Sequence, residues 1–234
     1  MKAVILAAGL GKRMKPLTDK VPKALVEMNG KPLVCHVLES LEKGGVKEAL
    51  IVIGYGGEKV KKRLGRKFGS IKLRYVKQAV PMGTAHAVLQ AKGRFKGKFL
   101  VASADVIFEK GMWKKLWEKK GFGAVVALRN EKKPERFGVA LVKGKKLLQI
   151  VEKPKKRLGN LVNAGAYCFS QTIFKELEKT KASSRGEFEL TDTVNALASK
   201  EKAGFVLYKG KCLDIGTLEE LKKAEKALVS ETLQ

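Results

Sequence analysis

Short apolar runs separated by amphipathic stretches organise the first half of the chain. Runs without polar alternation are typical of strands buried on both faces of a sheet. Four segments are predicted as strands: 2–6, 49–53, 71–76 and 99–102. Apolar residues at helical spacing predict helices from Pro32 to Gly44-Gly45 and over 58–64. This alternation predicts a parallel sheet with helices on both faces.

The pattern changes in the second half, where two strand-like segments flank a Lys143-Gly144-Lys145 turn and predict a hairpin. The predicted strands of this half are 124–128, 138–142, 147–151 and 166–169. The predicted helices are 112–119, 173–177 and the segment that begins at Glu187. Thr217 and Glu220 have the spacing of a capping box, which predicts a terminal amphipathic helix.

The loop after the first strand carries the clearest candidate chemistry. Its notable members are, in chain order, Leu6, Ala8, Gly9, Gly11, Lys12, Arg13 and Lys23. Glycines let the backbone turn and bring N–H groups against phosphate oxygens, while Arg and Lys neutralise the oxygens that face outward. The segment therefore predicts a polyphosphate-binding loop, with a tight surface turn as the alternative.

Two familiar phosphate loops do not fit this segment. Leu6 stands where a P-loop has its first Gly, and Arg13 stands where it has Ser or Thr. Met14 replaces the third Gly of the dinucleotide fingerprint. The loop must belong to another class.

Gln78 and Asp105 follow predicted strands, where ligands gather in open α/β sheets. The primary amide of Gln78 offers a donor and an acceptor, which suit N3–H and a carbonyl oxygen of uracil or thymine. Gly83 closes this loop, and Thr84 is placed to cap the next helix. Asp105 is a candidate metal ligand. The alternatives are an exposed loop glutamine and a turn-forming or helix-capping aspartate.

Composition indicates a folded globule: 234 residues, 44% hydrophobic, with six prolines. The longest apolar runs are too short to span a membrane, and Met1 leads directly into a strand, so we expect a cytoplasmic protein without a signal peptide. Three widely spaced cysteines are interpreted as free thiols, and two histidines are too few for a zinc site.

The net charge of +26 attracts polyanions, so nucleic acid is one candidate partner. The basic residues are scattered over helices and turns, with no basic tail or aromatic-interleaved stripe. This favours a basic surface that attracts nucleotide and sugar phosphate over specific nucleic-acid binding. Many lysines with few Asn and Gln also suggest a thermophile-like surface.

Six motifs, in a shared order, resemble those of the nucleoside-diphosphate-sugar pyrophosphorylases, the sugar-1-phosphate nucleotidyltransferases. The first loop has their Leu-Ala-Ala-Gly-x-Gly-x-Arg-Met pattern and ends in Pro22-Lys23. The others are Gln78 with Gly83-Thr84, Asp105, Glu152-Lys153-Pro154, Asn163-Ala164-Gly165 and Asp214-Ile215-Gly216-Thr217. Glu187 to Asp192 also resembles the family's Glu-x-x-Leu-Thr-Asp. Ala104 departs from the family's usual Gly-Asp, and Val106 stands where a polar residue is common.

The resemblance implies a role for each matching residue. The nucleotide-binding residues would be Leu6, Ala8, Gly9, Gly11, Lys12, Arg13, Gln78, Gly83 and Thr84. The sugar-phosphate-binding residues would be Gly138, Glu152, Lys153 and Asn163. The catalytic residues would be Arg13, Lys23, Asp105, Lys153 and Asp214, of which Asp105 and Asp214 would hold Mg²⁺.

The implied fold is α/β: a Rossmann-like three-layer α/β/α domain with a mixed, mostly parallel sheet. Residues 1–234 would form one nucleotidyltransferase domain, with a nucleotide half to about residue 110, a sugar-phosphate half from about 111, and no C-terminal β-helix. The implied reaction joins an NTP, expected to be UTP or dTTP, to a hexose-1-phosphate such as glucose-1-phosphate.

Three alternatives remain open at this point. One is a guanylyl- or cytidylyltransferase of the same fold. Another is a non-catalytic nucleotide or sugar-phosphate sensor, suggested by Ala104 and Val106. The third is a nucleic-acid-binding protein, suggested by the charge. The sequence does not decide the oligomeric state, and a homo-oligomer is compatible with it.

Overall fold

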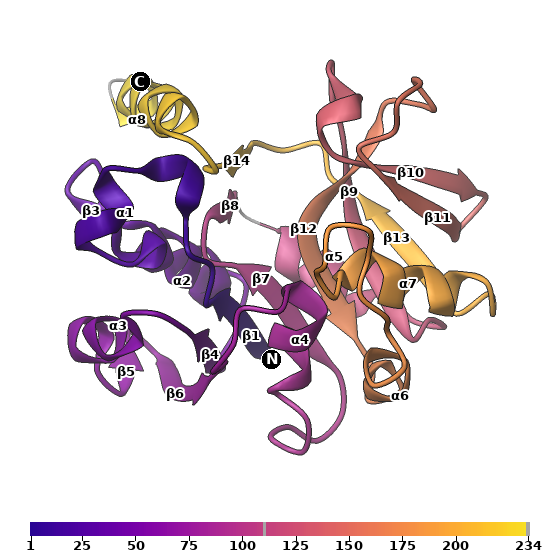
Figure 1. Ribbon diagram of the computed structural model, residues 1–234, viewed down its shortest axis with the longest axis horizontal. Coiled ribbons are helices and arrows are strands. Elements are labelled where there is room, and N and C mark those ends of the chain that lie inside the picture. Colours follow the sequence, from indigo (N-terminus) through magenta and orange to yellow (C-terminus); the bar gives the residue numbers. More distant parts are fainter. Residues whose placement is uncertain (110, 233–234) are drawn as a thin grey trace.

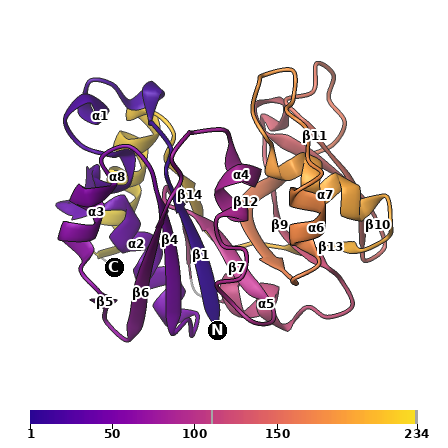
Figure 2. The same ribbon diagram turned by 60° about the horizontal axis from the view of Figure 1, so that its bottom comes forward.

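A computed structural model describes residues 1–109 and 111–232 of the chain. A ten-stranded sheet runs through it in the order β10-β11-β13-β9-β12-β7-β1-β4-β6-β5 (Figures 1 and 2). Its strands are β1 (Lys2–Ala7), β4 (Glu48–Ile53), β5 (Lys67–Phe68), β6 (Ile71–Lys77), β7 (Phe99–Ser103), β9 (Ala124–Asn130), β10 (Gly138–Lys143), β11 (Lys146–Glu152), β12 (Leu161–Phe169) and β13 (Ala203–Leu207). The expected α/β class is confirmed.

The N-terminal half of the sheet is parallel. β1 pairs with β4 on one side and β7 on the other, and β4 pairs with β6. Residues 3–5 and 49–53 are almost completely buried, which explains why these strands read as unbroken apolar runs. Because all four strands end at the same edge of the sheet, the loops that follow them lie close together.

The C-terminal half of the sheet is mixed. β12 runs antiparallel to both of its main neighbours, β7 and β9, while β13 is parallel to β9. The predicted hairpin is confirmed as β10 and β11, which the short turn forces to be antiparallel. β13 was not predicted, and β12 begins earlier than expected, so that it contains Asn163 and Gly165.

Helices pack on both faces of the sheet. One buried cluster includes side chains of α2, α3 and α5, and a second includes side chains of α4, α6 and α7. These helices are α2 (Leu33–Lys43), α3 (Gly57–Leu64), α4 (Thr84–Leu89), α5 (Met112–Glu118), α6 (Ile173–Leu177) and α7 (Leu190–Ala198). A one-turn helix, α1 (Leu17–Lys20), lies in the first loop, and β2 (Glu27–Met28) and β3 (Lys31–Pro32) form a small separate ribbon.

The C-terminal segment returns to the N-terminal half. After β13, strand β14 (Cys212–Asp214) pairs with β8 (Val106–Phe108), and α8 (Leu218–Thr232) lies over the region of α1 and β3 (Figure 1). A third buried cluster holds it there, in which Ile215 and Leu221 meet Met14 and Leu33. The end of the range assigned to the sugar-phosphate half therefore packs on the nucleotide half.

A buried polar contact joins strand β8 to helices α2 and α5. The hydroxyl of Ser40 in α2 donates to the carbonyl oxygen of Phe108 at 2.5 Å. The indole N–H of Trp113 in α5 donates to the same hydroxyl at 2.9 Å, and Trp113 is 1% exposed. One hydroxyl thus joins two helices to the strand that follows Asp105.

No helix among the residues that the structure describes is long and apolar enough to span a membrane.

Replacing Ser40 with alanine should weaken this support. The change leaves the Phe108 carbonyl and the Trp113 indole N–H buried without their partner, so the free energy of unfolding should fall by about 1–3 kcal/mol. Urea denaturation measures the change. Ser199→Ala, at an exposed hydroxyl bonded only to its own helix, is the control and should lose under about 0.5 kcal/mol. Equal losses in the two variants would contradict the expectation.

Candidate active site

The loop after β1 is folded back on itself by Gly11. This residue has φ of 65°, and a Cβ atom there would lie 2.8 Å from the Thr18 side chain and 2.9 Å from Cβ of Lys23. The Thr18 hydroxyl donates to the Gly11 carbonyl at 3.0 Å. Only glycine therefore allows the loop to fold back in this way, and the fold places Lys23 next to Gly11.

The other loop residues lie at the carboxyl end of β1. Leu6 accepts the N–H of Ala104 at its carbonyl oxygen, which joins the loop after β1 to the loop after β7. Gly9, Lys12 and Arg13 are exposed. Met14, between them and Lys23, is fully buried in the third cluster and anchors the loop.

Asp105 and Asp214 lie beside each other although they are far apart in the sequence. Asp105 immediately precedes β8, and Asp214 is the last residue of β14, opposite Val106. The N–H of Ile215 donates to the Asp105 carbonyl at 3.0 Å, so the backbone itself holds the two residues together. Lys23 makes an ion pair with the Asp105 carboxylate.

Burial of Asp214, together with the negative charge of Asp105, raises the pKa of the Asp214 carboxyl to about 6. Two carboxylates repel each other when they are close and poorly solvated, and a cation between them relieves the repulsion. Hard carboxylate oxygens suit Mg²⁺, which takes one or two carboxylates and completes its shell with water and substrate phosphates. The pair fits such an ion. Elsewhere in the described ranges, no group of three or more His, Cys, Asp or Glu could hold a metal.

The two departures from the family pattern around Asp105 have a packing explanation. Ala104 is 5% exposed and Val106 is 6% exposed, and both belong to the first buried cluster. Val106 also pairs with Asp214 across the β8–β14 ribbon. These residues support the carboxylate pair from the core side, so an apolar side chain at either position is compatible with the site.

Arg13, Lys153 and Asp214 line one cleft of about 330 Å³. The remaining lining residues are Arg136, Phe137, Gly216 and Glu220. The guanidinium of Arg13 lies over Gly216. The lining thus has three cations and two carboxylates, so a phosphate group and a metal ion can be held side by side there.

Gly138 and Glu152 are opposite each other in the β10–β11 hairpin. A Cβ at position 138 would lie 2.8 Å from Cγ2 of Ile150 and 2.9 Å from Oε1 of Glu152, so a larger residue would require these side chains to shift. Lys153 follows with φ of 43°, a conformation that is uncommon outside glycine and often found at functional sites. The Lys153 N–H donates to the Phe137 carbonyl at 3.0 Å, which holds this turn in place.

Asn163 is hydrogen-bonded within the protein. Its amide donates to the Tyr167 hydroxyl at 2.7 Å and accepts the Gly165 N–H at 3.0 Å, across an irregularity in β12. Burial, with smaller effects of Glu152 and Glu189, raises the pKa of Tyr167. Burial also raises the pKa of Glu189, and Arg185 opposes this effect. Asn163 and Tyr167 are thus bonded to each other, and the charges of Glu152 and Glu189 act on Tyr167.

Ala8 and Gln78 line a second cleft of about 650 Å³, between the first loop and the turn around Gly54 to Gly57. Gln78 is 4% exposed, and its amide NH₂ lies 3.2 Å from the Gly83 carbonyl and 2.9 Å from Nδ1 of His86. These bonds use the donor group of Gln78. Oε1 is therefore the part of the amide that remains to accept a bond from a ligand.

The expectation that Thr84 caps its own helix is wrong. Gly83 precedes α4, Thr84 is the first helical residue, and its hydroxyl makes no cap for α4. Instead, it accepts the N–H of Leu190, the first residue of α7, at 3.0 Å. The hydroxyl thus joins the start of α4 to the helix that carries Thr191. Thr191 itself is buried, and its hydroxyl has no protein partner.

The capping box at the start of α8 forms in a modified way. The Thr217 hydroxyl accepts the Glu220 N–H at 3.2 Å, as expected. Glu220 reaches past Thr217, however, and its Oε2 accepts the N–H of Gly216 at 2.9 Å. The box therefore stabilises the turn that follows Asp214.

The sequence analysis did not single out Arg136, Tyr167 or Glu189. It named Glu220 only as part of a capping box, and the structure shows that Glu220 also lines the cleft. Arg136 and Tyr167 are each close to a motif, one before Gly138 and one after Gly165. Proximity to a motif was the only signal that could have identified them. Their positions depend on how distant elements pack together.

A family model described as nucleotidyl transferase matches residues 2–231. The chain belongs to the nucleotidyl transferase family. This confirms the resemblance of its motifs to those of the sugar-1-phosphate nucleotidyltransferases.

Curated relatives agree with this membership. The bifunctional protein GlmU of Methanococcus maripaludis is 39% identical over 219 residues, which are 92% of this chain and 51% of the relative. The chain spans about half the length of the curated GlmU relatives that it matches. The UTP–glucose-1-phosphate uridylyltransferase AglF of Haloferax volcanii is 30% identical over 240 residues, with 100% of this chain and 99% of the relative covered.

Solved structures share the fold. A Bacillus anthracis protein provisionally assigned as a glucose-1-phosphate thymidylyltransferase, solved with sucrose, has a TM-score of 0.88 and 28% identity, covering 97% of this chain and 94% of that one. A UDP-glucose pyrophosphorylase solved with UDP-glucose has a TM-score of 0.89 at 23% identity, with 98% of each chain covered, and shows the likeness of fold alone.

Asp214→Asn should stabilise the protein at neutral pH when a chelator is present. A carboxyl whose folded-state pKa is raised to about 6 resists ionisation, so stability falls as pH rises from about 4 to about 6 and stays lower above that range. The neutral amide removes this penalty. The gain should be up to about 3 kcal/mol at pH 7.5 and should shrink towards pH 4.

Thermal unfolding across this pH range, with EDTA, measures the gain. Asp19→Asn, at an exposed carboxylate paired with Lys15, is the control and should show no gain that grows with pH. An Asp214→Asn gain that is constant with pH would contradict the electrostatic explanation.

Proposed function

We propose that this protein is a Mg²⁺-dependent sugar-1-phosphate nucleotidyltransferase. It would convert an NTP and a sugar-1-phosphate into an NDP-sugar and pyrophosphate. The observation that carries the proposal is the cleft in which Arg13 from the first loop faces Lys153 from the hairpin, with Asp214 between the two halves of the fold. A reaction between two polyanions needs such a place, where cations from both sides meet.

UTP or dTTP is the favoured nucleotide. The Gly83 carbonyl and His86 engage the NH₂ group of Gln78, which leaves Oε1 to accept the N3–H of uracil or thymine. Cytosine has no hydrogen at N3 and cannot make this contact. The whole-length similarity to a UTP–glucose-1-phosphate uridylyltransferase supports UTP with glucose-1-phosphate, and guanine nucleotides are the remaining alternative.

The chemistry requires little proton transfer. A phosphate monoester with a second pKa near 6 is mostly dianionic at neutral pH, so the sugar phosphate can attack the α-phosphorus without a general base. The protein would contribute position and charge. Arg13 would bind the pyrophosphate that leaves, Lys23 the region of the α-phosphate, and Lys153 the incoming sugar phosphate. Gly138, Glu152 and Asn163 would contact the sugar.

Mg²⁺, when bound, would offset the negative charge of the substrate phosphates. Asp105 and Asp214 would hold it. Lys23 already pairs with Asp105, so it orients one of these carboxylates. Because Ala104 and Val106 are core residues that support this pair, they give no reason to favour a non-catalytic sensor.

The direct test is a matrix of nucleotides against sugar-1-phosphates, scored by pyrophosphate release. UTP or dTTP with glucose-1-phosphate and Mg²⁺ should give the highest rate, and EDTA should abolish it. Release that is fastest with GTP would select a guanylyltransferase instead. Binding of substrates without pyrophosphate release from any combination would select a sensor.

Asp105→Asn should lower Mg²⁺-dependent turnover by at least about 10²-fold while the protein stays folded. The amide cannot supply the charge that a cation needs among the phosphates. Steady-state pyrophosphate release and circular dichroism measure the two properties. Asp19→Asn removes one exposed carboxylate outside the clefts and should retain full activity. Turnover close to wild type in Asp105→Asn would remove Asp105 from the mechanism.

Gln78→Ala should lower kcat/KM for UTP and dTTP about tenfold, and should change the values for GTP and ATP less. The variant loses the acceptor that reads N3–H of the base. Gln90→Ala is the matched control, because Gln90 contacts the other side of His86 and lines neither cleft. An equal loss for all four nucleotides would exclude Gln78 from base recognition.

A further inference from the structure

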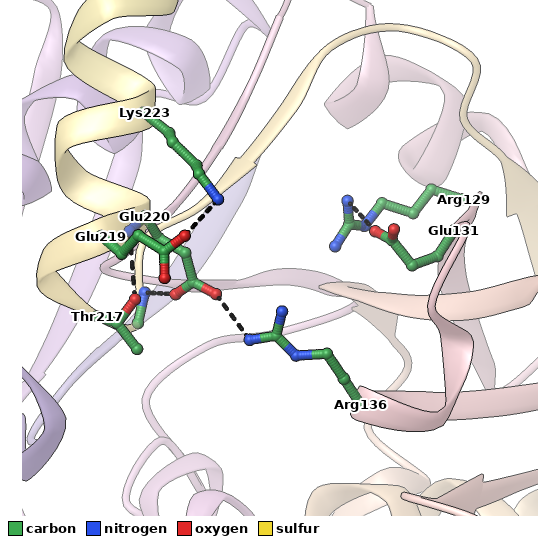
Figure 3. A network of polar contacts seen from close by, with 8 residues as sticks. Arg129, Glu131, Arg136, Thr217, Glu219, Glu220 and Lys223 are labelled. Atoms are coloured by element: carbon green, nitrogen blue, oxygen red, sulfur yellow. Dashed lines mark hydrogen bonds and ion pairs between the residues drawn. The ribbon is translucent and has the colours of Figure 1, made fainter.

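An ion pair between Arg136 and Glu220 lies in the lining of the smaller cleft. Arg136 comes from the 3₁₀ turn Pro134–Arg136 before β10, and Glu220 comes from the first turn of α8 (Figure 3). Nη2 of Arg136 lies 3.5 Å from Oε1 of Glu220. The pair therefore joins the sugar-phosphate half to the helix that follows Asp214.

The two partners are held very differently. Glu220 is fixed by its own segment, because its Oε2 accepts the Gly216 N–H and its own N–H donates to Thr217. The Arg136 side chain is 60% exposed, and its contact with Glu220 is long. Exposed pairs of this kind contribute little stability, so Arg136 can exchange its partner without disturbing the fold.

Arg136 lies where an incoming phosphate would need a cation. It lines the same cleft as Arg13 and Lys153. Its neighbour Phe137 accepts the Lys153 N–H at its carbonyl oxygen, so Arg136 and Lys153 are placed on one side of the cleft by the same backbone contact. A guanidinium can bind a phosphate through two parallel N–H bonds, and a dianionic phosphate attracts it more strongly than a single carboxylate does.

We propose that Arg136 binds the phosphate group of the sugar-1-phosphate. Before the substrate binds, Arg136 is paired with Glu220, and the phosphate then displaces the Glu220 carboxylate. The inference rests on the proposed function and adds a residue and a competition to the same site. Glu220 then acts as an internal competitor: it keeps Arg136 near the cleft, and its charge disfavours weakly charged anions.

Substitutions at Arg136 and at Glu220 separate these roles. Arg136→Met should raise KM for the sugar-1-phosphate at least about tenfold, with KM for the NTP changed less than about twofold, because a charged hydrogen bond is lost on one substrate only. Arg136→Lys, which keeps the charge and loses the planar fork, should recover part of the affinity. Glu220→Gln should lower KM for the sugar-1-phosphate, since the amide still accepts the Gly216 N–H but no longer competes for Arg136. In the Arg136→Met background, Glu220→Gln should have little effect.

An exposed ion pair outside the cleft supplies the controls. Lys146 and Glu201 lie 2.7 Å apart, and neither residue lines the cleft. Glu201→Gln and Lys146→Met change the net charge by the same amounts as Glu220→Gln and Arg136→Met. Both controls should leave KM within about twofold, because exposed charges outside the cleft are screened by salt.

Calorimetric titration of glucose-1-phosphate without nucleotide distinguishes failure of the inference from failure of the proposed function. Wild-type turnover with an unchanged sugar-phosphate KM in Arg136→Met would overturn the inference and leave the function standing. A loss that falls on the NTP would also overturn it, because Arg136 would then serve the triphosphate. Binding that depends on Arg136 without any turnover would support the inference and refute the enzyme. Absence of both binding and turnover would refute both.

Discussion

The candidate site depends on the pairing of two three-residue strands, β8 and β14. This ribbon places Asp214 beside Asp105 and returns the chain from the sugar-phosphate half to the nucleotide half. Placing the two carboxylates together costs electrostatic free energy, since burial beside Asp105 raises the pKa of Asp214 to about 6. Ser40, Trp113 and the apolar contacts of Ile215 hold the ribbon in place against this repulsion. A cation between the carboxylates would remove the repulsion, which makes the strained arrangement suitable for binding one.

Charge is organised around this point. The chain carries +26, but the cations that matter are the few whose positions are set by backbone contacts. Gly11 brings Lys23 to Asp105, and the Phe137 carbonyl holds Lys153 at the cleft. The scattered surface lysines raise the local concentration of anionic substrates, while these residues decide where phosphates would bind. The ion pair of Arg136 with Glu220 belongs to the second group.

Much of the fold could be predicted from local pattern. The parallel strands around β1 were identified because they are buried on both faces, and the hairpin was identified by its turn. Strands β8, β13 and β14 were missed, since they are runs of only three to five residues without clear alternation. Thr84 was assigned as a cap of its own helix because sequence spacing cannot show that the N–H of Leu190, from a distant helix, is a nearer donor.

The sequence by itself determined the family and the residue types of the site, because the spacing of Gly9, Gly11, Arg13 and Lys23 can be read within a single loop. Only the tertiary structure decided which distant residues meet. It placed Asp214 beside Asp105, engaged the NH₂ group of Gln78 with Gly83 and His86, and brought Arg136 to Glu220. These contacts follow from strand pairing and from the return of α8 to the N-terminal half. Local spacing carries no information about such long-range contacts, because they arise only when the separate elements pack together.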